Sequence, residues 1–226
     1  MQTDSKNHDW WIDPREYARQ EERRGRRHAY ERLDAARTAL VVIDMVPFFA
    51  EANPYVRGIV PNIGRIAEAL RTADGLVTWV LPANEAPLGS VSSEFYGPTV
   101  SEAFAATGGE GRLRSRLWHA LDVRPEDLVV EKTAYSAFFP GRSPLPELLA
   151  QRDIDTVLIA GTLTNVCCES SARDAATTGL RVLMVADANA ARRDQDHNAT
   201  LHTIYRSFGD VRTTDEVLDL IGQRPN

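Results

Sequence analysis

Short apolar runs with few charges recur along the chain, and longer, more polar segments separate them. These runs are rich in Val, Ile and Leu and show no strict alternation of apolar and polar residues. Such runs are typical of strands that are buried on both faces of a sheet. They predict strands at residues 38–45, 76–81, 128–131, 155–161 and 181–186, and a last short strand near Val211.

The segments between the runs carry the signals of helices. In 57–73, apolar residues recur every three or four positions along one face. Residues 166–178 contain neither Pro nor Gly, and the side chains of Thr164 and Asn165 are expected to cap the start of that helix. Further helices are predicted at residues 145–152, 196–208 and 214–221.

Strands and helices therefore alternate from residue 38 onward. This order predicts an α/β fold with three α/β/α layers, in which a central, mainly parallel six-stranded sheet is covered on both faces in a Rossmann-like manner. We expect residues 38–226 to form this domain and residues 1–37 to form an N-terminal arm. Segment 82–111 is expected to be a loop-rich insertion, and long insertions at a strand's carboxyl end often wall a substrate site.

The N-terminal arm is dense in Arg and Glu. We expect residues 1–9 to be disordered, and a helix to begin at Asp13 and Pro14 and extend over 15–33. Because acidic residues are interleaved with the basic ones, an extension lying on the domain or on a partner subunit is favoured over a nucleic-acid-binding arm. Aromatic residues on the arm favour a homo-oligomer, a dimer or a tetramer, because a free tail would not expose them. They are Trp10, Trp11, Tyr17 and Tyr30.

The composition is that of a globular protein. Of the 226 residues, 43% are hydrophobic, which excludes a disordered polymer. The net charge of −6 argues against general nucleic-acid binding. No apolar run approaches the length of a membrane span, and the N-terminus lacks the apolar core of a secretory signal. The two cysteines are adjacent and offer no disulfide framework, so a reducing, cytoplasmic location is expected.

Reactive residue types follow three of the predicted strands. Asp44 lies near the end of the first strand and Lys132 follows the third. Cys167 and Cys168 follow the fourth, where a helix begins. Because the carboxyl ends of parallel strands meet at one edge of the sheet, these side chains should converge there as general base, stabilising cation and nucleophile. The two cysteines are about 100° apart around a helix, so only one can face the edge, and the other should be an inert buried side chain.

The segments VVIDM, EKTAYSAFF and GTLTNVCCESSARDA surround these residues. At these spacings, residues 38–221 resemble the isochorismatase-like cysteine hydrolase superfamily. Its members include nicotinamidases, N-carbamoylsarcosine amidohydrolase, ureidoacrylate amidohydrolases and streptothricin hydrolase. The resemblance implies a catalytic triad of Asp44, Lys132 and Cys167 and selects Cys167 over Cys168.

The same resemblance implies further parts of the site. A cis peptide bond is expected between Thr162 and Leu163, with the backbone N–H groups of Leu163 and Cys167 forming an oxyanion hole. Side chains near the triad and in the insertion are expected to contact the substrate. They are Phe49, Asn84, Tyr135 and Phe138.

The function implied is hydrolysis of a C–N bond in a small, non-peptide amide, ureido or cyclic amide compound, through a thioester on the cysteine. No cofactor is expected. The family often has Gln where this chain has Val46, so a polar contact near the site is expected to be missing. Nicotinamidases carry a metal-binding Asp and histidines soon after the first strand, and because no histidine lies between His28 and His119, their metal site is not expected here. The alternatives are a vinyl-ether hydrolase of the isochorismatase type and a catalytically silent ligand-binding protein with the same fold.

Two other sites are possible from the residues alone. A Cys–His hydrolase would use His197 or His202, but no third group that would orient the histidine is evident. A metal site would combine Asp194 and Asp196 with the same histidines, but positions i and i+5 do not share a helix face. We therefore predict no metal site.

Overall fold

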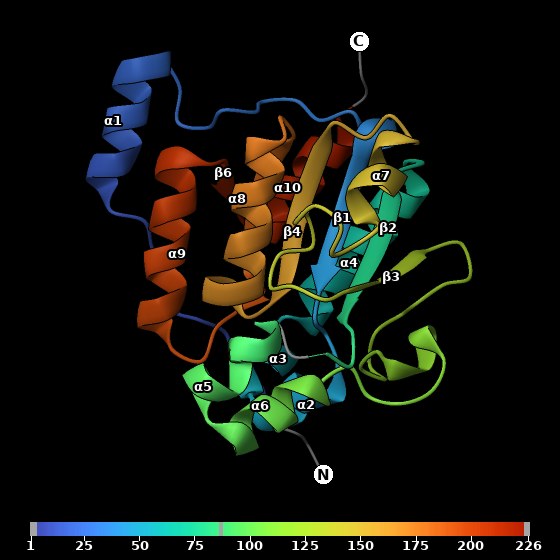
Figure 1. The fold of residues 1–226 in the computed structure, drawn as a ribbon. Coiled ribbons are helices and arrows are strands. Elements are labelled where there is room, and N and C mark those ends of the chain that lie inside the picture. Colours follow the sequence, from blue (N-terminus) through green and yellow to red (C-terminus); the bar gives the residue numbers. More distant parts are fainter. Residues whose placement is uncertain (1–3, 86–87, 224–226) are drawn as a thin grey trace.

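The computed structural model describes residues 4–85 and 88–223. Its sheet has six strands in the order β3-β2-β1-β4-β5-β6, and every neighbouring pair is parallel (Figure 1). The predicted fold class is confirmed, with a sheet that is entirely rather than mainly parallel. The strands are β1 (Thr38–Ile43), β2 (Leu76–Pro82), β3 (Leu128–Lys132), β4 (Thr156–Thr162), β5 (Arg181–Ala190) and β6 (Asp210–Arg212).

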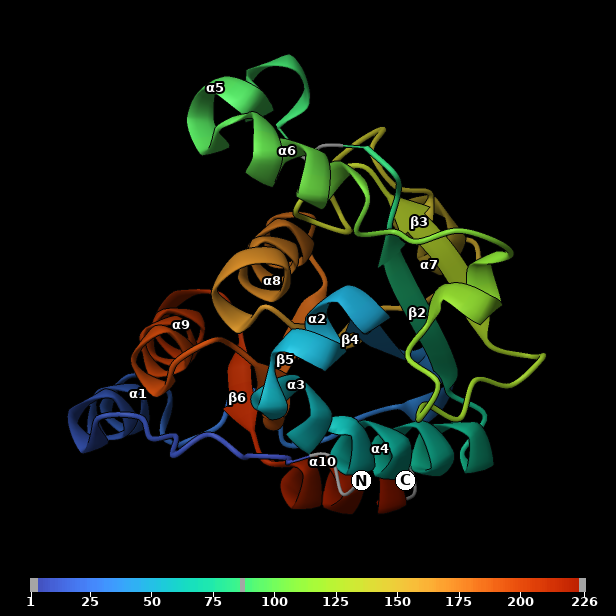
Figure 2. The same cartoon turned by 90° about the horizontal axis from the view of Figure 1, so that it is seen from below.

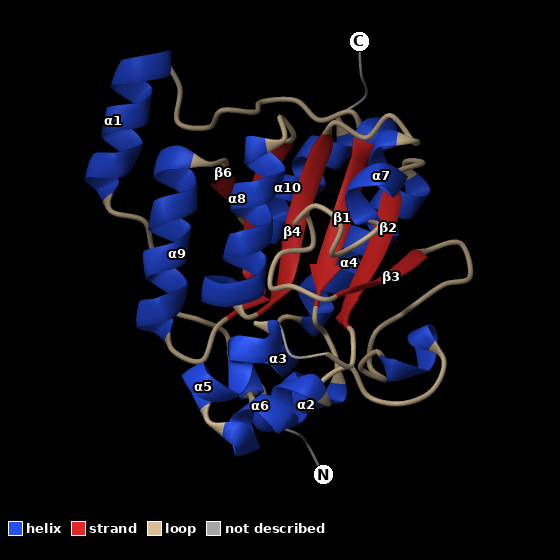
Figure 3. Cartoon of the chain, viewed as in Figure 1, coloured by secondary structure: helices blue, strands red, loops and turns tan. Residues whose placement is uncertain are grey.

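Helices cover both faces of the sheet, with α4 and α10 on one face and α7, α8 and α9 on the other (Figures 2 and 3). The α-helices are α1 (Pro14–Arg24), α2 (Pro47–Ala52), α3 (Pro54–Gly58), α4 (Val60–Thr72), α5 (Ser92–Tyr96), α6 (Pro98–Ala105), α7 (Leu145–Ala150), α8 (Glu169–Thr177), α9 (Asp194–Ser207) and α10 (Thr214–Gly222). Short 3₁₀ turns lie at η1 (Ala35–Arg37), η2 (Gly89–Val91) and η3 (Leu113–Arg116), and η4 (Thr164–Cys168) is a π-helical turn.

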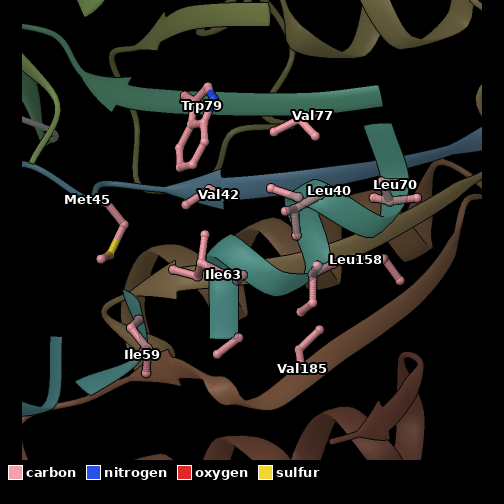
Figure 4. Close-up of a cluster of buried hydrophobic side chains, with 14 of the residues drawn as sticks. Leu40, Val42, Met45, Ile59, Ile63, Leu70, Val77, Trp79, Leu158 and Val185 are labelled. Atoms are coloured by element: carbon pink, nitrogen blue, oxygen red, sulfur yellow. The ribbon is translucent and has the colours of Figure 1, made fainter. Parts of the chain in front are cut away.

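The core lies on both sides of β1, because successive strand residues point to opposite faces. Leu40 and Val42 pack toward α4 and α10, together with Trp79 (Figure 4). Val41 and Ile43 pack toward α7, α8 and α9. Each fully buried side chain of this size contributes roughly 1.5–3 kcal/mol by leaving water. This two-sided burial explains why the strands appear in the sequence as unbroken apolar runs.

The carboxyl edge of the sheet is where α2, α3, α5 and α6 gather, below the strand arrowheads in Figure 1. The expectation of a loop-rich segment at 82–111 is wrong in part, because it contains α5 and α6. Pro98 occupies the first turn of α6, a position that a helix start tolerates well.

The N-terminal arm differs from the prediction in two ways. Its helix ends at Arg24 rather than near residue 33, because Gly25 adopts a left-handed conformation (φ 73°) and its N–H caps Glu21 O. Residues 4–9, expected to be disordered, lie against the domain, where Lys6 N donates to Pro54 O. The predicted start is confirmed, since the Asp13 side chain accepts from Arg15 N.

Two predicted helices have different boundaries in the structure. The helix predicted at 57–73 is divided into α3 and α4, which meet at Ile59. The chain expected to be helical from residue 166 begins as the π-helical turn η4, and its α-helical part, α8, starts only at Glu169.

Candidate active site

The triad residues expected at the carboxyl edge of the sheet lie together there. Asp44 directly follows β1, Lys132 is the last residue of β3, and Cys167 lies in η4 after β4. Lys132 Nζ is 2.9 Å from Asp44 Oδ2 and 3.5 Å from Cys167 Sγ, and it also donates to Ala134 O at 3.1 Å. One ammonium group therefore contacts both the carboxylate and the sulfur.

Burial determines the charges of this trio. The side chains of Lys132 and Asp44 are 3% and 2% exposed. Burial raises the pKa of the Cys167 thiol, the nearby Asp44 carboxylate raises it further, and Lys132 opposes both. Burial also raises the pKa of Asp44, and this effect is larger than the lowering of that pKa by Lys132. Burial would lower the pKa of Lys132, but Asp44 and Cys167 outweigh it and raise that pKa. The favoured state is an ammonium–carboxylate pair beside a protonated thiol.

The second carboxylate oxygen of Asp44 is free to accept a hydrogen bond. Asp44 Oδ1 is buried and has no hydrogen-bond partner among the described residues. The backbone of Asp44 has φ 55°, a left-handed conformation that non-glycine residues adopt rarely and that Asp adopts more readily than most. Gly161 allows β4 to approach β1 closely at this point, since a Cβ there would lie 2.2 Å from Ile43 O.

The turn that carries the cysteine begins at Leu163. The Thr162–Leu163 peptide bond is cis, as expected from the resemblance. Among the described residues the Leu163 N–H has no acceptor, whereas its carbonyl accepts from Val166 N and Cys168 N. The expectation that Thr164 or Asn165 caps the helix is wrong, because Leu163 is the N-cap of η4 and neither η4 nor α8 has a side-chain cap.

A cavity of about 270 Å³ opens over the triad and has mostly apolar walls. Its lining residues are Asp44, Phe49, Pro82, Glu85, Tyr96, Phe104, Thr107, Lys132, Thr133, Ala134, Tyr135, Leu163, Val166, Cys167 and Arg192. Of the residues expected to contact substrate, Phe49 and Tyr135 line this cavity. Asn84 does not, since its amide donates to Gly109 O at 2.8 Å. Phe138 does not either, because it is 1% exposed and lies in the core.

Arg192 and Tyr96 are among the lining residues that the sequence analysis did not identify. Arg192 follows β5, but the strand was predicted to end at residue 186, so its carboxyl end was misplaced. If the strand had been predicted to end at Ala190, Arg192 would have been identified as a site residue, because like Lys132 it lies at the carboxyl end of a parallel strand. Tyr96 comes from α5, and its hydroxyl forms a hydrogen bond with the hydroxyl of Tyr135 across the cavity. No signal in the sequence marks that pairing.

The alternative sites are not assembled. His197 Nδ1 is 2.9 Å from Thr164 Oγ1, and His202 lies 3.5 Å from Glu16. Neither histidine is bonded to Cys167. Within residues 4–85 and 88–223, no group of three or more His, Cys, Asp or Glu side chains is placed to hold a metal ion. Cys168 is fully buried next to Cys167, and burial raises the pKa of its thiol well above the usual range.

Comparison with known proteins agrees with this geometry. The isochorismatase domain model matches residues 38–216. The isochorismatase family protein YwoC of Bacillus subtilis is 29% identical over 84% of this chain and 96% of its own length. The ureidoacrylate amidohydrolase RutB of Variovorax paradoxus is 30% identical over 81% of each chain. The crystal structure of a cysteine hydrolase from Pseudomonas syringae pv. phaseolicola superimposes with a TM-score of 0.74 at 29% identity, covering 86% of this chain and 96% of that one. The chain therefore belongs to the isochorismatase family of hydrolases.

Proposed function

We propose that the chain is a cysteine-dependent amidohydrolase that cleaves the C–N bond of a small, non-peptide amide, ureido or cyclic amide compound. The observation that carries the proposal is the contact of Lys132 Nζ with both Asp44 Oδ2 (2.9 Å) and Cys167 Sγ (3.5 Å) at the base of the cavity. A thiol, a buried carboxylate and a cation in contact are the parts that acyl transfer through a covalent intermediate requires.

The first half of the reaction forms a thioester. Asp44 takes the proton of Cys167 while Sγ attacks the carbonyl carbon of the substrate. The N–H groups of Leu163 and Cys167 hold the oxyanion that develops. Asp44 then gives its proton to the departing nitrogen, the C–N bond breaks, and ammonia or an amine leaves.

The second half releases the acid. A water molecule gives a proton to Asp44 and attacks the thioester carbon, so that the C–S bond breaks. The proton on Asp44 returns to the sulfur, which restores the protonated thiol. Lys132 remains charged throughout and stabilises the negative charge as it moves between the carboxylate and the sulfur. No step requires a cofactor.

The cavity favours a substrate that also carries an acidic group. Phe49, Phe104 and Val166 provide apolar walls, and Arg192 lies among them. Among the described residues, Arg192 forms no salt bridge, whereas Glu85, the other charged side chain at the rim, lies 3.9 Å from Arg142. A guanidinium is suited to bind a carboxylate through two hydrogen bonds. The relative from Variovorax paradoxus, named for ureidoacrylate, acts on a compound of this class.

The first prediction tests the reaction type. Incubation with small amides, ureido acids, cyclic amides and isochorismate, followed by acid quenching, should give an acyl adduct that peptide mass analysis places on Cys167. The adduct should be absent from the Cys167→Ala variant. Extensive chelation should leave the hydrolysis intact. Turnover of isochorismate alone, without any adduct, would favour vinyl-ether hydrolysis, and no turnover at all would favour a silent ligand-binding protein.

The second prediction concerns assembly, since we also propose a homo-oligomer, a dimer or a tetramer. Trp10, Tyr17 and Tyr30 pack against the chain's own core, so the arm supports this proposal less than expected. Support comes instead from Trp11, which is 59% exposed, and Phe95, which is 72% exposed on α5. Sedimentation at micromolar concentration should show a species of at least twice the chain mass, and a monomer alone would contradict the proposal.

We also propose that the protein acts in the cytoplasm. Both cysteines are free, and a thiol nucleophile must remain reduced to act. None of the helices in the described part of the chain is long and apolar enough to cross a membrane.

A further inference from the structure

The segment before α1 is attached to the domain at both ends. Near its start, Arg57 Nη2 donates to Asp4 O at 2.7 Å, and the Lys6 carbonyl passes so close to α3 that a Cβ on Gly58 would lie 1.9 Å from it. Near its end, the amide of Asn198 on α9 donates to Asp9 O and accepts from Trp11 N. The position of the segment between these attachments, which runs from α3 to the first half of α9, is therefore fixed on the domain.

His8 lies in the middle of this segment, and its side chain is 2% exposed. Its ring is stacked between Tyr55, at 4.0 Å between centroids, and His197, at 4.2 Å. Its Nδ1 is 2.6 Å from Asp194 Oδ1, and its Nε2 is 3.0 Å from Ala191 N. Both faces and both nitrogens of the ring are thus in contact with other parts of the chain.

The donor at Ala191 determines where the ring proton is. A backbone N–H can only donate, so Nε2 of His8 must accept and carries no proton. The proton is then on Nδ1 and is donated to Asp194. Burial lowers the pKa of His8, while Asp194 opposes this effect, so the ring is held in its neutral form.

These contacts connect His8 to both sides of the cavity. Ala191 directly precedes Arg192, which lines the cavity, and its carbonyl accepts from Asn53 at 2.9 Å. On the other side, the ring that stacks on His8 belongs to His197, whose Nδ1 is bonded to Thr164 Oγ1 in the turn that carries Cys167.

We propose that His8 is a positioning residue for the substrate site, which holds Arg192 in place through Ala191 and steadies the cysteine turn through His197. This inference rests on the proposed function, because it takes Cys167 as the reacting thiol and Arg192 as the contact for an anionic group. It adds a part of the site that lies outside residues 38–216, which match the family domain.

The third prediction uses two thiol reagents and no substrate. Iodoacetate and iodoacetamide should both alkylate Cys167. In each reaction a C–S bond forms, iodide leaves and Asp44 takes the thiol proton. Only iodoacetate carries a carboxylate for Arg192. The ratio of the two labelling rates therefore reports the position of Arg192, while general changes in thiol reactivity cancel.

The variant His8→Phe retains a stacked ring but leaves Ala191 N and Asp194 without their partner. It should lower the iodoacetate to iodoacetamide ratio at least about threefold, within the range expected when a charge-assisted contact is weakened. His8→Gln places an acceptor near the position of Nε2 and should recover most of the ratio. The matched control is His28→Phe, because His28 belongs to the same arm but lies 3.6 Å from Asp210, at β6. It should keep the wild-type ratio.

The variant Arg192→Met distinguishes the proposed anion contact of Arg192 from the proposed positioning role of His8. It should lower the ratio about tenfold, and if it does not, the anion contact in the proposed function is wrong. If Arg192→Met lowers the ratio but a folded His8→Phe does not, only the inference about His8 is overturned. An unchanged ratio in folded His8→Phe overturns that inference in every case. Thermal melting of each variant shows whether it is folded. If His8→Phe is not folded, His8→Leu provides the same test, because it also lacks an acceptor for Ala191 N.

Discussion

Replacing Cys167 with Ala is expected to abolish amide hydrolysis, with kcat/KM falling by at least about 10⁴-fold, a loss typical of removing a catalytic nucleophile. No other group in the described structure is placed to replace the sulfur, because Cys168 is fully buried beside it. The fold should be retained, since the change removes a single atom that lines the cavity. Steady-state kinetics on the best substrate of the panel, together with circular dichroism, measure both effects.

Cys168→Ala is the matched control. It removes a sulfur of the same kind one residue away, from a packed position on the side of α8. It should leave turnover within about threefold of wild type and cost roughly 1 kcal/mol of stability, as for other small deletions in a core. Iodoacetamide should label Cys167 first, and substrate should protect it. The opposite result, with Cys168 labelled and required, would exclude the proposed nucleophile.

Replacing Lys132 with Met should lower turnover at least about a hundredfold, the usual effect of losing an electrostatic partner in an active site. Lys132 is the group that opposes the effect of burial on Asp44, so its loss raises the pKa of Asp44 further. Asp44 accepts a proton only as a carboxylate, which exists above its pKa. The acidic limb of the pH–rate profile should therefore move to higher pH, which kinetics over a pH series will measure.

A double variant separates catalysis from stability. Lys132→Met alone leaves a buried carboxylate without its cation and should cost roughly 3–5 kcal/mol in the free energy of unfolding. Adding Asp44→Asn removes the second charge and should restore much of that stability, but not the turnover. Turnover of Lys132→Met within about tenfold of wild type would remove Lys132 from the mechanism.

The inner strands and the proximity of Asp44, Lys132 and Cys167 are what the sequence predicts best. The apolar runs match β1, β2, β4 and the first half of β5 because these inner strands are buried on both faces, and such burial favours apolar residues at most positions. Asp44, Lys132 and Cys167 could be placed together because the carboxyl ends of parallel strands share one edge. The choice of Cys167 over Cys168 came from the family resemblance.

The errors occur where local patterns compete with a single residue or with a distant contact. The helix of the arm was predicted too long because its charged residues continue beyond Gly25, although that glycine ends α1. Thr164 matches the pattern of a cap, but its hydroxyl is taken by His197, which is 33 residues away. Phe138 resembles a pocket residue by its position after Lys132, yet its ring is in the core.

The sequence by itself determined the layers of the fold, the edge of the sheet where the candidate site lies and the residue types that gather there, because these depend on local burial and on strand order. Only the tertiary structure decided the contact of Lys132 with both Asp44 and Cys167, the place of Arg192 in the cavity and the burial of His8. These features arise from contacts such as that of His8 with Asp194, which are 186 residues apart. No local periodicity encodes such a pair, since it forms only once the arm and the domain are folded together.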